Sequence, residues 1–188
     1  MPHPHISSAQ SSILIVVDIQ EPFAKAMADR AALVKNTSAL IHVAKAVGMP
    51  IIVTEQNPEK LGPTVPELKK PLEAVGAYLP LPKMAFSCCA ADGFVKRVYD
   101  TGRDTLVITG MEGHVCIQQT TLEALNLGYK VHVVQDAVTS RRREDYASAI
   151  EKMRHAGAII TTTEMAAYEW LGAAGTPEFK TAMQWLKW

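Results

Sequence analysis

The sequence predicts a three-layer α/β domain whose central sheet is parallel. Five short runs rich in valine and isoleucine recur along the chain, and they are too apolar to alternate, as expected of strands that helices cover on both faces. The longer segments between them carry apolar residues at three- and four-residue steps and end at a glycine, as amphipathic helices do. Strand followed by glycine-terminated helix, repeated at this pitch, is typical of right-handed βαβ units.

The elements follow in order along the chain. The predicted strands are "ILIVVD" (13–18), "PIIVT" (50–54), "TLVITG" (105–110), "KVHVVQD" (130–136) and "AIITTT" (158–163). The predicted helices are "AALVKNTSALIHVAKAVG", "CIQQTTLEALNLGYK" and "REDYASAIEKMRHAG", which end at Gly48, Gly128 and Gly157. The final "TPEFKTAMQWLKW" predicts a capped helix whose two tryptophans need a partner surface.

The stretch 55–82 differs from the rest because prolines recur throughout it. We expect an irregular segment there with one short strand near Ala77 to Leu81. Structureless stretches of this size within compact domains are more often functional than not.

Length and composition favour one domain. The chain has 188 residues, of which 48% are apolar and 20% charged, enough for one core and short of two. We expect residues 1–12 to form a disordered leader and 13–188 a single domain. The formal net charge is zero, and the basic run at 141–143 is followed at once by Glu144 and Asp145, as in a solvated loop or helix start. Nucleic acid is therefore not expected as a partner.

Membrane and secretory signals are not expected either. Apolar runs such as "ILIVV" fall short of the roughly 20 residues that a membrane span requires. The start, "MPHPHISSAQSS", lacks the basic and apolar regions of a signal peptide. Three cysteines, two of them the adjacent Cys88 and Cys89, do not form a disulfide framework, which favours a reducing cytoplasm.

Candidate chemistry lies where predicted strands end, since sites in open α/β sheets form beyond those ends. Asp18 ends the first strand; alone, such an aspartate is a base, a helix cap, or a metal or ribose ligand. No glycine-rich turn follows it, so a dinucleotide site is disfavoured. Lys83 follows the "LPLP" run, where a solvated charge is the ordinary interpretation unless an anion lies near it.

Cys116 follows the fourth strand by the short turn "GMEGHV" and begins a helix that runs to about Leu127. A helix N-terminus lowers a thiol pKa from about 8.5 toward values where thiolate exists at neutral pH. Inert packing is the competing interpretation. Gly110 and Gly113 favour reactivity, since they suit a tight turn that aims backbone amides at a developing oxyanion. Cys88 and Cys89 begin another helix without such a turn, so we interpret them as structural.

These residues resemble a known family. The segments "ILIVVDIQEPF", "LPKMAFS", "ITGMEGHVCIQQT" and "VHVVQDAVTSR" resemble the isochorismatase-like cysteine hydrolases, most closely the branch of isochorismatase domain-containing proteins. The segment "VTEQNPEKLGPTVPEL" also resembles that branch. The resemblance extends from about residue 12 to 172, in the expected order and spacing.

The resemblance implies a three-layer α/β/α fold with a six-stranded parallel sheet of Rossmann-like topology, and homo-oligomers. It implies a catalytic triad of Asp18, Lys83 and Cys116, a non-proline cis peptide at Met111-Glu112, and an oxyanion hole formed by the amides of Glu112 and Cys116. Asp18 would accept the thiol proton, and Cys116 would attack a carbonyl carbon to form a thioester.

Departures from other branches narrow the expected substrate. Nicotinamidases of the family bind a metal through an aspartate and two histidines after the second strand, and "TEQNPEKLGPTVPEL" has no histidine. We therefore expect no metal and no other cofactor. Isochorismatases themselves typically lack the nucleophilic cysteine, so Cys116 favours a small amide, carbamoyl or related acyl substrate.

A substrate pocket is expected near the triad, lined by Gln20, Phe23, Phe86, Glu55 and His114. Phe23 is equally well explained as a core aromatic, and Glu55 as a residue that caps or salt-bridges its own loop.

Two other functions remain open. The chain could be an oligomeric scaffold or small-ligand-binding protein that retains the fold. It could also be a thiol sensor in which Cys116 is oxidised and Cys88 or Cys89 resolves it, which requires Cα atoms within about 7 Å.

Overall fold

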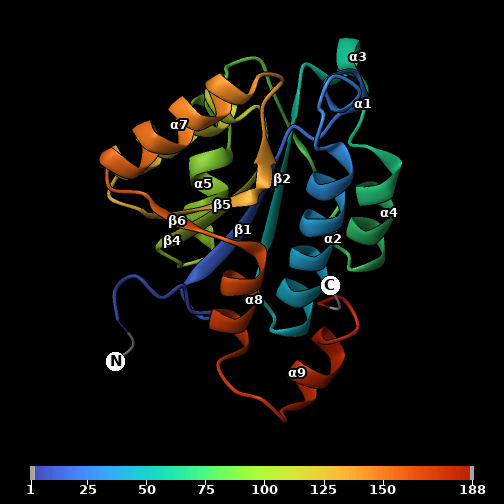
Figure 1. The fold of residues 1–188 in the computed structure, drawn as a ribbon, viewed down its shortest axis with the longest axis vertical. Coiled ribbons are helices and arrows are strands. Elements are labelled where there is room, and N and C mark those ends of the chain that lie inside the picture. The colour runs from blue at the N-terminus through green and yellow to red at the C-terminus, as the bar shows by residue number, and fades with distance from the viewer. Residues whose placement is uncertain (1–2, 187–188) are drawn as a thin grey trace.

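Three layers form the protein (Figure 1). The structure, a computed structural model, describes residues 3–186, and over that range the middle layer is a six-stranded parallel sheet in the order β3-β2-β1-β4-β5-β6. The strands are β1 (Ser12–Val17), β2 (Ile51–Gln56), β3 (Leu81–Lys83), β4 (Thr105–Met111), β5 (Lys130–Thr139) and β6 (Ile159–Thr161). The predicted fold class, including the six strands, is confirmed.

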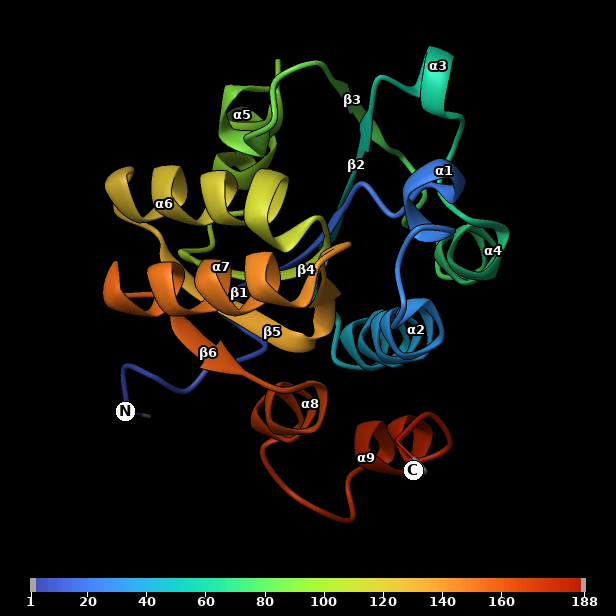
Figure 2. The same cartoon turned by 45° about the horizontal axis from the view of Figure 1, so that its top comes forward.

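Helices cover both faces of the sheet (Figure 2). The core on one face includes residues of α2 (Arg30–Ala46), α4 (Pro66–Ala74), α8 (Thr163–Leu171) and α9 (Pro177–Ala182). The core on the other includes residues of α5 (Phe94–Asp100), α6 (Gln118–Asn126) and α7 (Arg143–His155). The short helices α1 (Glu21–Ala24) and α3 (Pro58–Leu61) follow the ends of β1 and β2.

The central strand β1 shows why these runs are apolar without alternation. Leu14 and Val16 join one core, Ile13 and Ile15 join the other, and all four are fully buried. Each such side chain contributes about 1.5–3 kcal/mol by leaving water. A polar side chain facing either core would therefore destabilise the folded state.

The predicted irregular segment at 55–82 is more ordered than expected. It contains α3 and α4, and its strand lies at Leu81–Lys83 rather than near Ala77 to Leu81. Pro58 and Pro66 occupy the first helical positions, where the missing N–H would have had no partner. These two prolines thus mark where helices begin, and the prediction of an irregular stretch was wrong for that reason.

The N-terminal segment packs against the domain for part of its length. Ser7 and Ala9 are buried, so the predicted disordered leader over 1–12 does not hold for them. Ser7 donates from its N–H and its Oγ to Glu169 Oε2, at 2.9 and 2.7 Å, and it accepts from Trp170 Nε1 at 3.1 Å. Strand β1 begins at Ser12.

The C-terminal helix is capped as predicted, because the side chain of Thr176 accepts a hydrogen bond from the N–H of Phe179. Trp185 finds its partner surface in this domain, where its ring stacks on that of His42 with centroids 3.5 Å apart. Trp188 lies outside the described residues. None of the helices within residues 3–186 is both long and apolar enough to cross a membrane.

Strands β1 and β4 lie side by side at the centre, and the chain winds outward from them in both directions. Such a switch in winding leaves a crevice beyond the carboxyl ends of the two strands. Gly110 brings the strands together there: its φ is +128°, and an added Cβ would collide with the backbone of Val17, its register partner.

We expect Gly110→Ala to lower the free energy of unfolding by roughly 3 kcal/mol or more, because strain in the backbone adds to overpacking against Val17. The matched control is Gly157→Ala. That glycine also has a positive φ, +103°, but open space around its Cβ position, so a loss of about 1–2 kcal/mol is expected. Urea unfolding measures both. Equal losses would contradict the proposed close approach of β4 to β1.

Candidate active site

Asp18, Lys83 and Cys116 meet beyond the carboxyl ends of the central strands. Asp18 follows β1, Lys83 ends β3, and Cys116 follows β4. Lys83 Nζ lies 2.6 Å from Asp18 Oδ2 and 3.5 Å from Cys116 Sγ. The three residues are 1%, 4% and 7% exposed, respectively. The structure thus assembles a carboxylate, an ammonium and a thiol in a nearly dry cluster.

The Lys83 ammonium is held by polar groups from two segments. It donates to Gln56 Oε1 at 2.7 Å, and to the carbonyls of Phe86 and Ala85 at 3.0 and 3.2 Å. Burial lowers the pKa of Lys83, but the Asp18 carboxylate and, once ionised, the nearby cysteines raise it more, so the net pKa lies above the ordinary lysine value. The site therefore contains a fixed positive charge.

Asp18 adopts a backbone conformation that is uncommon for residues other than glycine, with φ of +51°. Thr54 Oγ1 donates to Asp18 Oδ1 at 2.8 Å. Oδ2 forms the ion pair with Lys83. Burial raises the pKa of Asp18, and Lys83 and Thr54 offset only part of that rise. The carboxylate is therefore a stronger base than an ordinary aspartate.

Cys116 lies in a single π-helical turn, Gly113–Ile117, from which α6 continues. The peptide bond between Met111 and Glu112, just before this turn, is cis. Burial raises the pKa of Cys116 to about 12, and the Asp18 carboxylate adds to the rise while Lys83 opposes it. The expectation that the helix N-terminus would lower this pKa is therefore wrong for the resting site, because desolvation and the carboxylate outweigh the helix.

These charges determine where the thiol proton can go. At rest the site holds one ammonium, one carboxylate and one neutral thiol. If the proton moves from Cys116 to Asp18, the ammonium of Lys83 faces a thiolate instead of a carboxylate, and the net charge stays zero. Moving the proton out to water would instead create an excess negative charge in a desolvated place, which is costly. The arrangement thus favours Asp18 as the acceptor.

The carboxylate of Glu112 pairs with Arg141 and not with the Lys83 ammonium. Arg141 donates from Nε to both carboxylate oxygens at 3.0 Å, and from Nη2 to Oε1 at 2.7 Å. His114 Nδ1 lies 3.5 Å from Glu112 Oε2. Bidentate contact of this kind fixes orientation as well as charge. The basic run at 141–143, interpreted as a solvated segment, thus supplies a residue that holds the turn before Cys116.

Thr54 and Gln56 were missed by the sequence analysis. Both belong to the end of β2, whose last residues are polar and buried. The polar "TEQ" at the end of an apolar strand was the available signal, since parallel strands end at one edge of the sheet.

The residues predicted to line a substrate pocket are placed differently from one another. Gln20 is buried, its Nε2 donating to the carbonyls of Gln56 and Gly62, at 3.0 and 2.7 Å. Glu55 is buried and accepts from Thr64 N, Thr64 Oγ1 and Tyr78 Oη at 2.7–2.8 Å. Both side chains hold loop backbone in place, and for Glu55 this agrees with the alternative of a residue that caps its own loop.

The other three predicted pocket residues lie nearer the surface. Phe23 is half-buried and packs against the core on the α2 side, as its core alternative anticipated. Phe86 is 54% exposed, and its carbonyl accepts from Lys83. His114 is half-buried, two residues before Cys116. Of the five residues, Phe86 and His114 are thus adjacent to the cluster and still accessible.

Two pockets can be compared with the position of the thiol site. One of about 520 Å³ is lined by Lys83 and by neighbours on the same loop, Met84 and Ala85, together with Asn57 and Pro58. Its volume lies within the range of small-molecule sites.

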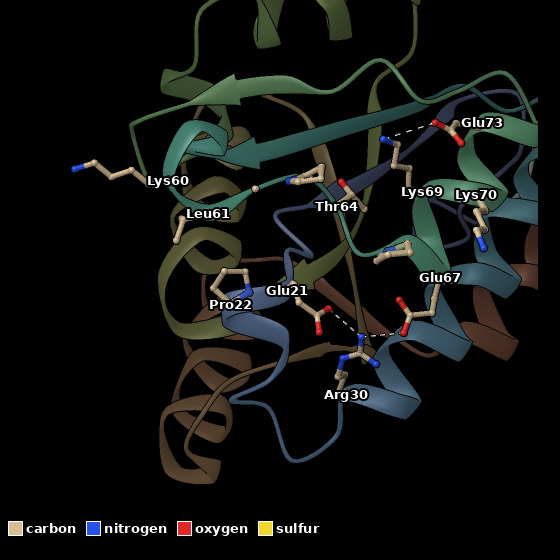
Figure 3. A pocket seen from close by; sticks show the side chains of 13 residues that line it. Glu21, Pro22, Arg30, Lys60, Leu61, Thr64, Glu67, Lys69, Lys70 and Glu73 are labelled. Carbon is tan, nitrogen blue, oxygen red and sulfur yellow. Dashed lines mark hydrogen bonds and ion pairs between the residues drawn. The ribbon is translucent and has the colours of Figure 1, made fainter.

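The other pocket, of about 930 Å³, lies between α1 and α4 (Figure 3). Within it, the side chain of Arg30 bridges two carboxylates: its Nη2 lies 3.1 Å from Glu21 Oε2 and 2.9 Å from Glu67 Oε1. None of the three clustered residues lines it. The larger pocket is therefore separate from the thiol site.

Comparison with known proteins identifies relatives over most of the chain. A family model described as "Isochorismatase domain" matches residues 12–165. The secreted isochorismatase effector Isc1 of Phytophthora sojae is 37% identical over 180 residues, covering 94% of this chain and 85% of that protein. Isochorismatase domain-containing protein 2 of Xenopus laevis is 37% identical over 171 residues, covering 91% and 81%.

Solved structures agree with these sequence relatives. The MAR1 ribonuclease of Caenorhabditis elegans has a TM-score of 0.86 and 36% identity, covering 96% of this chain and 91% of that one. YcaC of Pseudomonas aeruginosa, solved with hexane-2,5-diol and covalent acrylamide, has a TM-score of 0.88 and 25% identity, covering 98% and 93%. YcaC of Escherichia coli, described as an octameric hydrolase of unknown specificity, has a TM-score of 0.84 and 27% identity, covering 92% and 85%.

The charge arrangement predicts opposite effects for two substitutions. In Asp18→Asn the buried ammonium of Lys83 lacks a counterion, so the Cys116 thiol ionises more readily and its alkylation by iodoacetamide at neutral pH accelerates, by about tenfold for each unit of pKa lost. In Lys83→Met the cation that opposes the rise in the Cys116 pKa is lost, and alkylation slows. Peptide mass spectrometry against time measures both rates.

Cys89 is the internal control for this experiment, because the charged neighbour that affects its pKa is Glu123 and not Asp18. Its rate should stay constant in both variants. If both substitutions change the Cys116 rate in the same direction, the charge arrangement given above is incorrect.

Proposed function

The chain belongs to the isochorismatase domain family, and on that premise we propose that it is a metal-independent cysteine hydrolase that cleaves a C–N bond of a small amide or carbamoyl compound. The observation that carries the proposal is the position of Lys83 Nζ, 2.6 Å from Asp18 Oδ2 and 3.5 Å from Cys116 Sγ. One ammonium therefore contacts both the base and the nucleophile that thiol catalysis needs.

The first half of the reaction forms a thioester. Asp18 accepts the proton of Cys116, and the sulfur attacks the carbonyl carbon of the substrate. The backbone N–H groups of Glu112 and Cys116 stabilise the oxyanion of the tetrahedral intermediate. The C–N bond then breaks, and protonated Asp18 returns its proton to the departing nitrogen, so that ammonia or an amine leaves.

The second half consumes one water. Asp18, ionised again, accepts a proton from the water as it attacks the thioester carbonyl. The C–S bond breaks, the acid product leaves, and the proton on Asp18 returns to the sulfur. Lys83 remains charged throughout and compensates whichever neighbour is negative at each stage, which accounts for its five close polar contacts.

Chemistry in a related structure supports a nucleophile in this fold. The YcaC protein of Pseudomonas aeruginosa was solved with covalent acrylamide, and acrylamide is an electrophile that thiolates attack. Another relative is called a ribonuclease, so a short RNA belongs in any substrate panel beside primary amides, carbamoyl compounds and esters.

We also propose that the protein is a homo-oligomer. An octameric relative has this fold, and Met84 and Phe86, beside the thiol site, are 71% and 54% exposed. Light scattering coupled to gel filtration measures the mass directly, and a monomer at micromolar concentration would oppose the proposal.

We expect Cys116→Ala to lower kcat by roughly 10³-fold or more for any amide that the wild type cleaves, since the nucleophile is lost. Cys89→Ala should retain activity. Ammonia release measures turnover, and rapid acid quenching followed by intact-protein mass spectrometry should detect the acyl group on wild type alone. Equal turnover by Cys116→Ala and wild type would exclude the thiol mechanism. The absence of turnover across the whole panel would favour the scaffold or ligand-binding alternative.

The pH dependence should reflect Asp18, which must be ionised to accept the thiol proton. Burial raises the pKa of Asp18, so kcat/KM should fall with decreasing pH at higher pH values than an ordinary aspartate would give. Thr54→Val removes a hydrogen bond that lowers this pKa. The acid limb of the profile should therefore move to still higher pH, with little change at the optimum. A shift toward lower pH would contradict the assignment of Asp18 as the base.

A further inference from the structure

A second buried thiol lies beside the site and has no part in the mechanism given above. Cys88 is fully buried, and its Sγ lies 3.7 Å from Thr54 Oγ1, the hydroxyl that donates to Asp18 Oδ1. The Asp18 carboxylate and the Lys83 ammonium both act on the pKa of Cys88, as they do on that of Cys116. The two thiols thus have the same carboxylate and ammonium as neighbours.

A hydrogen bond to the helical segment after Cys116 also holds Cys88 near that residue. The N–H of Cys88 donates to Thr120 Oγ1 at 2.9 Å. Thr120 is four residues after Cys116 and therefore on the same side of the helical segment, one turn further on. The short 3-10 helix Cys88–Ala90 is thus held against the first turns after Cys116.

Cys89 is placed differently, although it is the next residue. Its Sγ lies 3.9 Å from the carbonyl of Thr120, and Glu123 is the charged neighbour that acts on its pKa. It is half-buried and packs against the edge of the core cluster of which Cys88 and Cys116 are buried members. Cys89 can therefore serve as the control residue for Cys88.

We propose that Cys88 is a resolving thiol, which converts an oxidised Cys116 into a Cys88–Cys116 disulfide and so protects the nucleophile from irreversible oxidation. The oxidant is a hydroperoxide small enough to reach a sulfur that is 7% exposed, hydrogen peroxide being the simplest. The sulfur of Cys116 attacks one peroxide oxygen, the O–O bond breaks, and the thiol proton leaves with the other oxygen as water. Cys116 is then a sulfenic acid, and the peroxide is reduced.

The second step needs no further oxidant. The sulfur of Cys88 attacks the sulfur of the sulfenic acid, the S–O bond breaks, and an S–S bond forms. The proton of Cys88 passes to the departing hydroxide, which leaves as water. Thr54 Oγ1, 3.7 Å from Cys88 Sγ and 2.8 Å from Asp18 Oδ1, connects that sulfur to a carboxylate that can relay the proton. A thiol reductant then regenerates both cysteines.

This inference concerns the regulation of the site in the proposed function and rests on the nucleophilic character of Cys116 that the function requires. Its test reads sulfur chemistry and not turnover, so the two can fail separately. The full-length protein is treated with hydrogen peroxide, free thiols are blocked with iodoacetamide under denaturing conditions, and unreduced tryptic peptides are analysed by mass spectrometry. Cys88 and Cys89 fall in peptide 84–96, and Cys116 falls in peptide 104–130.

In wild type we expect these two peptides to be cross-linked, and dithiothreitol to restore the alkylation of Cys116. Cys89→Ala should give the same result. In Cys88→Ala the cross-link should disappear and Cys116 should accumulate as sulfinic and sulfonic acids that dithiothreitol does not reverse. Cys88→Ser repeats the test with a polar side chain, in case loss of the buried sulfur impairs folding.

Three results would overturn the proposal: a cross-link that persists in both Cys88 variants, wild-type Cys116 that proceeds to sulfinic acid without a cross-link, or Cys116 that peroxide leaves unmodified. A cross-link in a protein that hydrolyses no amide would support the resolving thiol and oppose the hydrolase. Amide turnover without a cross-link would support the hydrolase and oppose the resolving thiol.

Discussion

The ammonium of Lys83 is the charge around which the thiol site is built. It is buried, and burial of a single cation costs several kcal/mol unless neighbours compensate it. The carboxylate of Asp18, the amide oxygen of Gln56, two backbone carbonyls and the sulfur of Cys116 supply that compensation. These groups come from β1, β2, the loop after β3 and the turn after β4, so a single interaction ties together the ends of four strands.

The sheet topology makes this convergence possible. With β1 and β4 adjacent at the centre and β2 and β3 beyond β1, the side chain of Lys83 reaches past the end of β2 to Asp18. Gly110 allows β4 to approach the backbone of Val17, one residue before Asp18. Arg141, two residues after β5, holds the carboxylate of Glu112, the residue before the thiol turn. Local geometry at the site is therefore imposed by the sheet and not by the loops alone.

The parts of this arrangement that the sequence predicts are those set by strand order. Apolar runs locate strands, parallel strands end at one edge, and so Asp18, Lys83 and Cys116 could be expected to meet. The direction of the Cys116 pKa could not be predicted, because it depends on burial and on the distance to a carboxylate from another strand. The contacts of Gln20 could not be predicted for a similar reason, because its amide donates to the carbonyls of Gln56 and Gly62, which are distant in sequence. The prolines of 55–82 favoured an irregular stretch, but Pro58 and Pro66 begin helices there.

The central claim is that the resting sulfur of Cys116 is neutral and that its proton moves to Asp18 only during reaction. The most direct test is the ultraviolet difference spectrum between wild type and Cys116→Ser at neutral pH, in which a thiolate gives a distinct absorbance that a thiol lacks. The account predicts no thiolate absorbance in wild type, and its appearance in Asp18→Asn, where Lys83 has lost the carboxylate of Asp18. A full thiolate signal in wild type at neutral pH would contradict the account, because the ammonium of Lys83 would then pair with sulfur at rest and Asp18 would have no proton to accept.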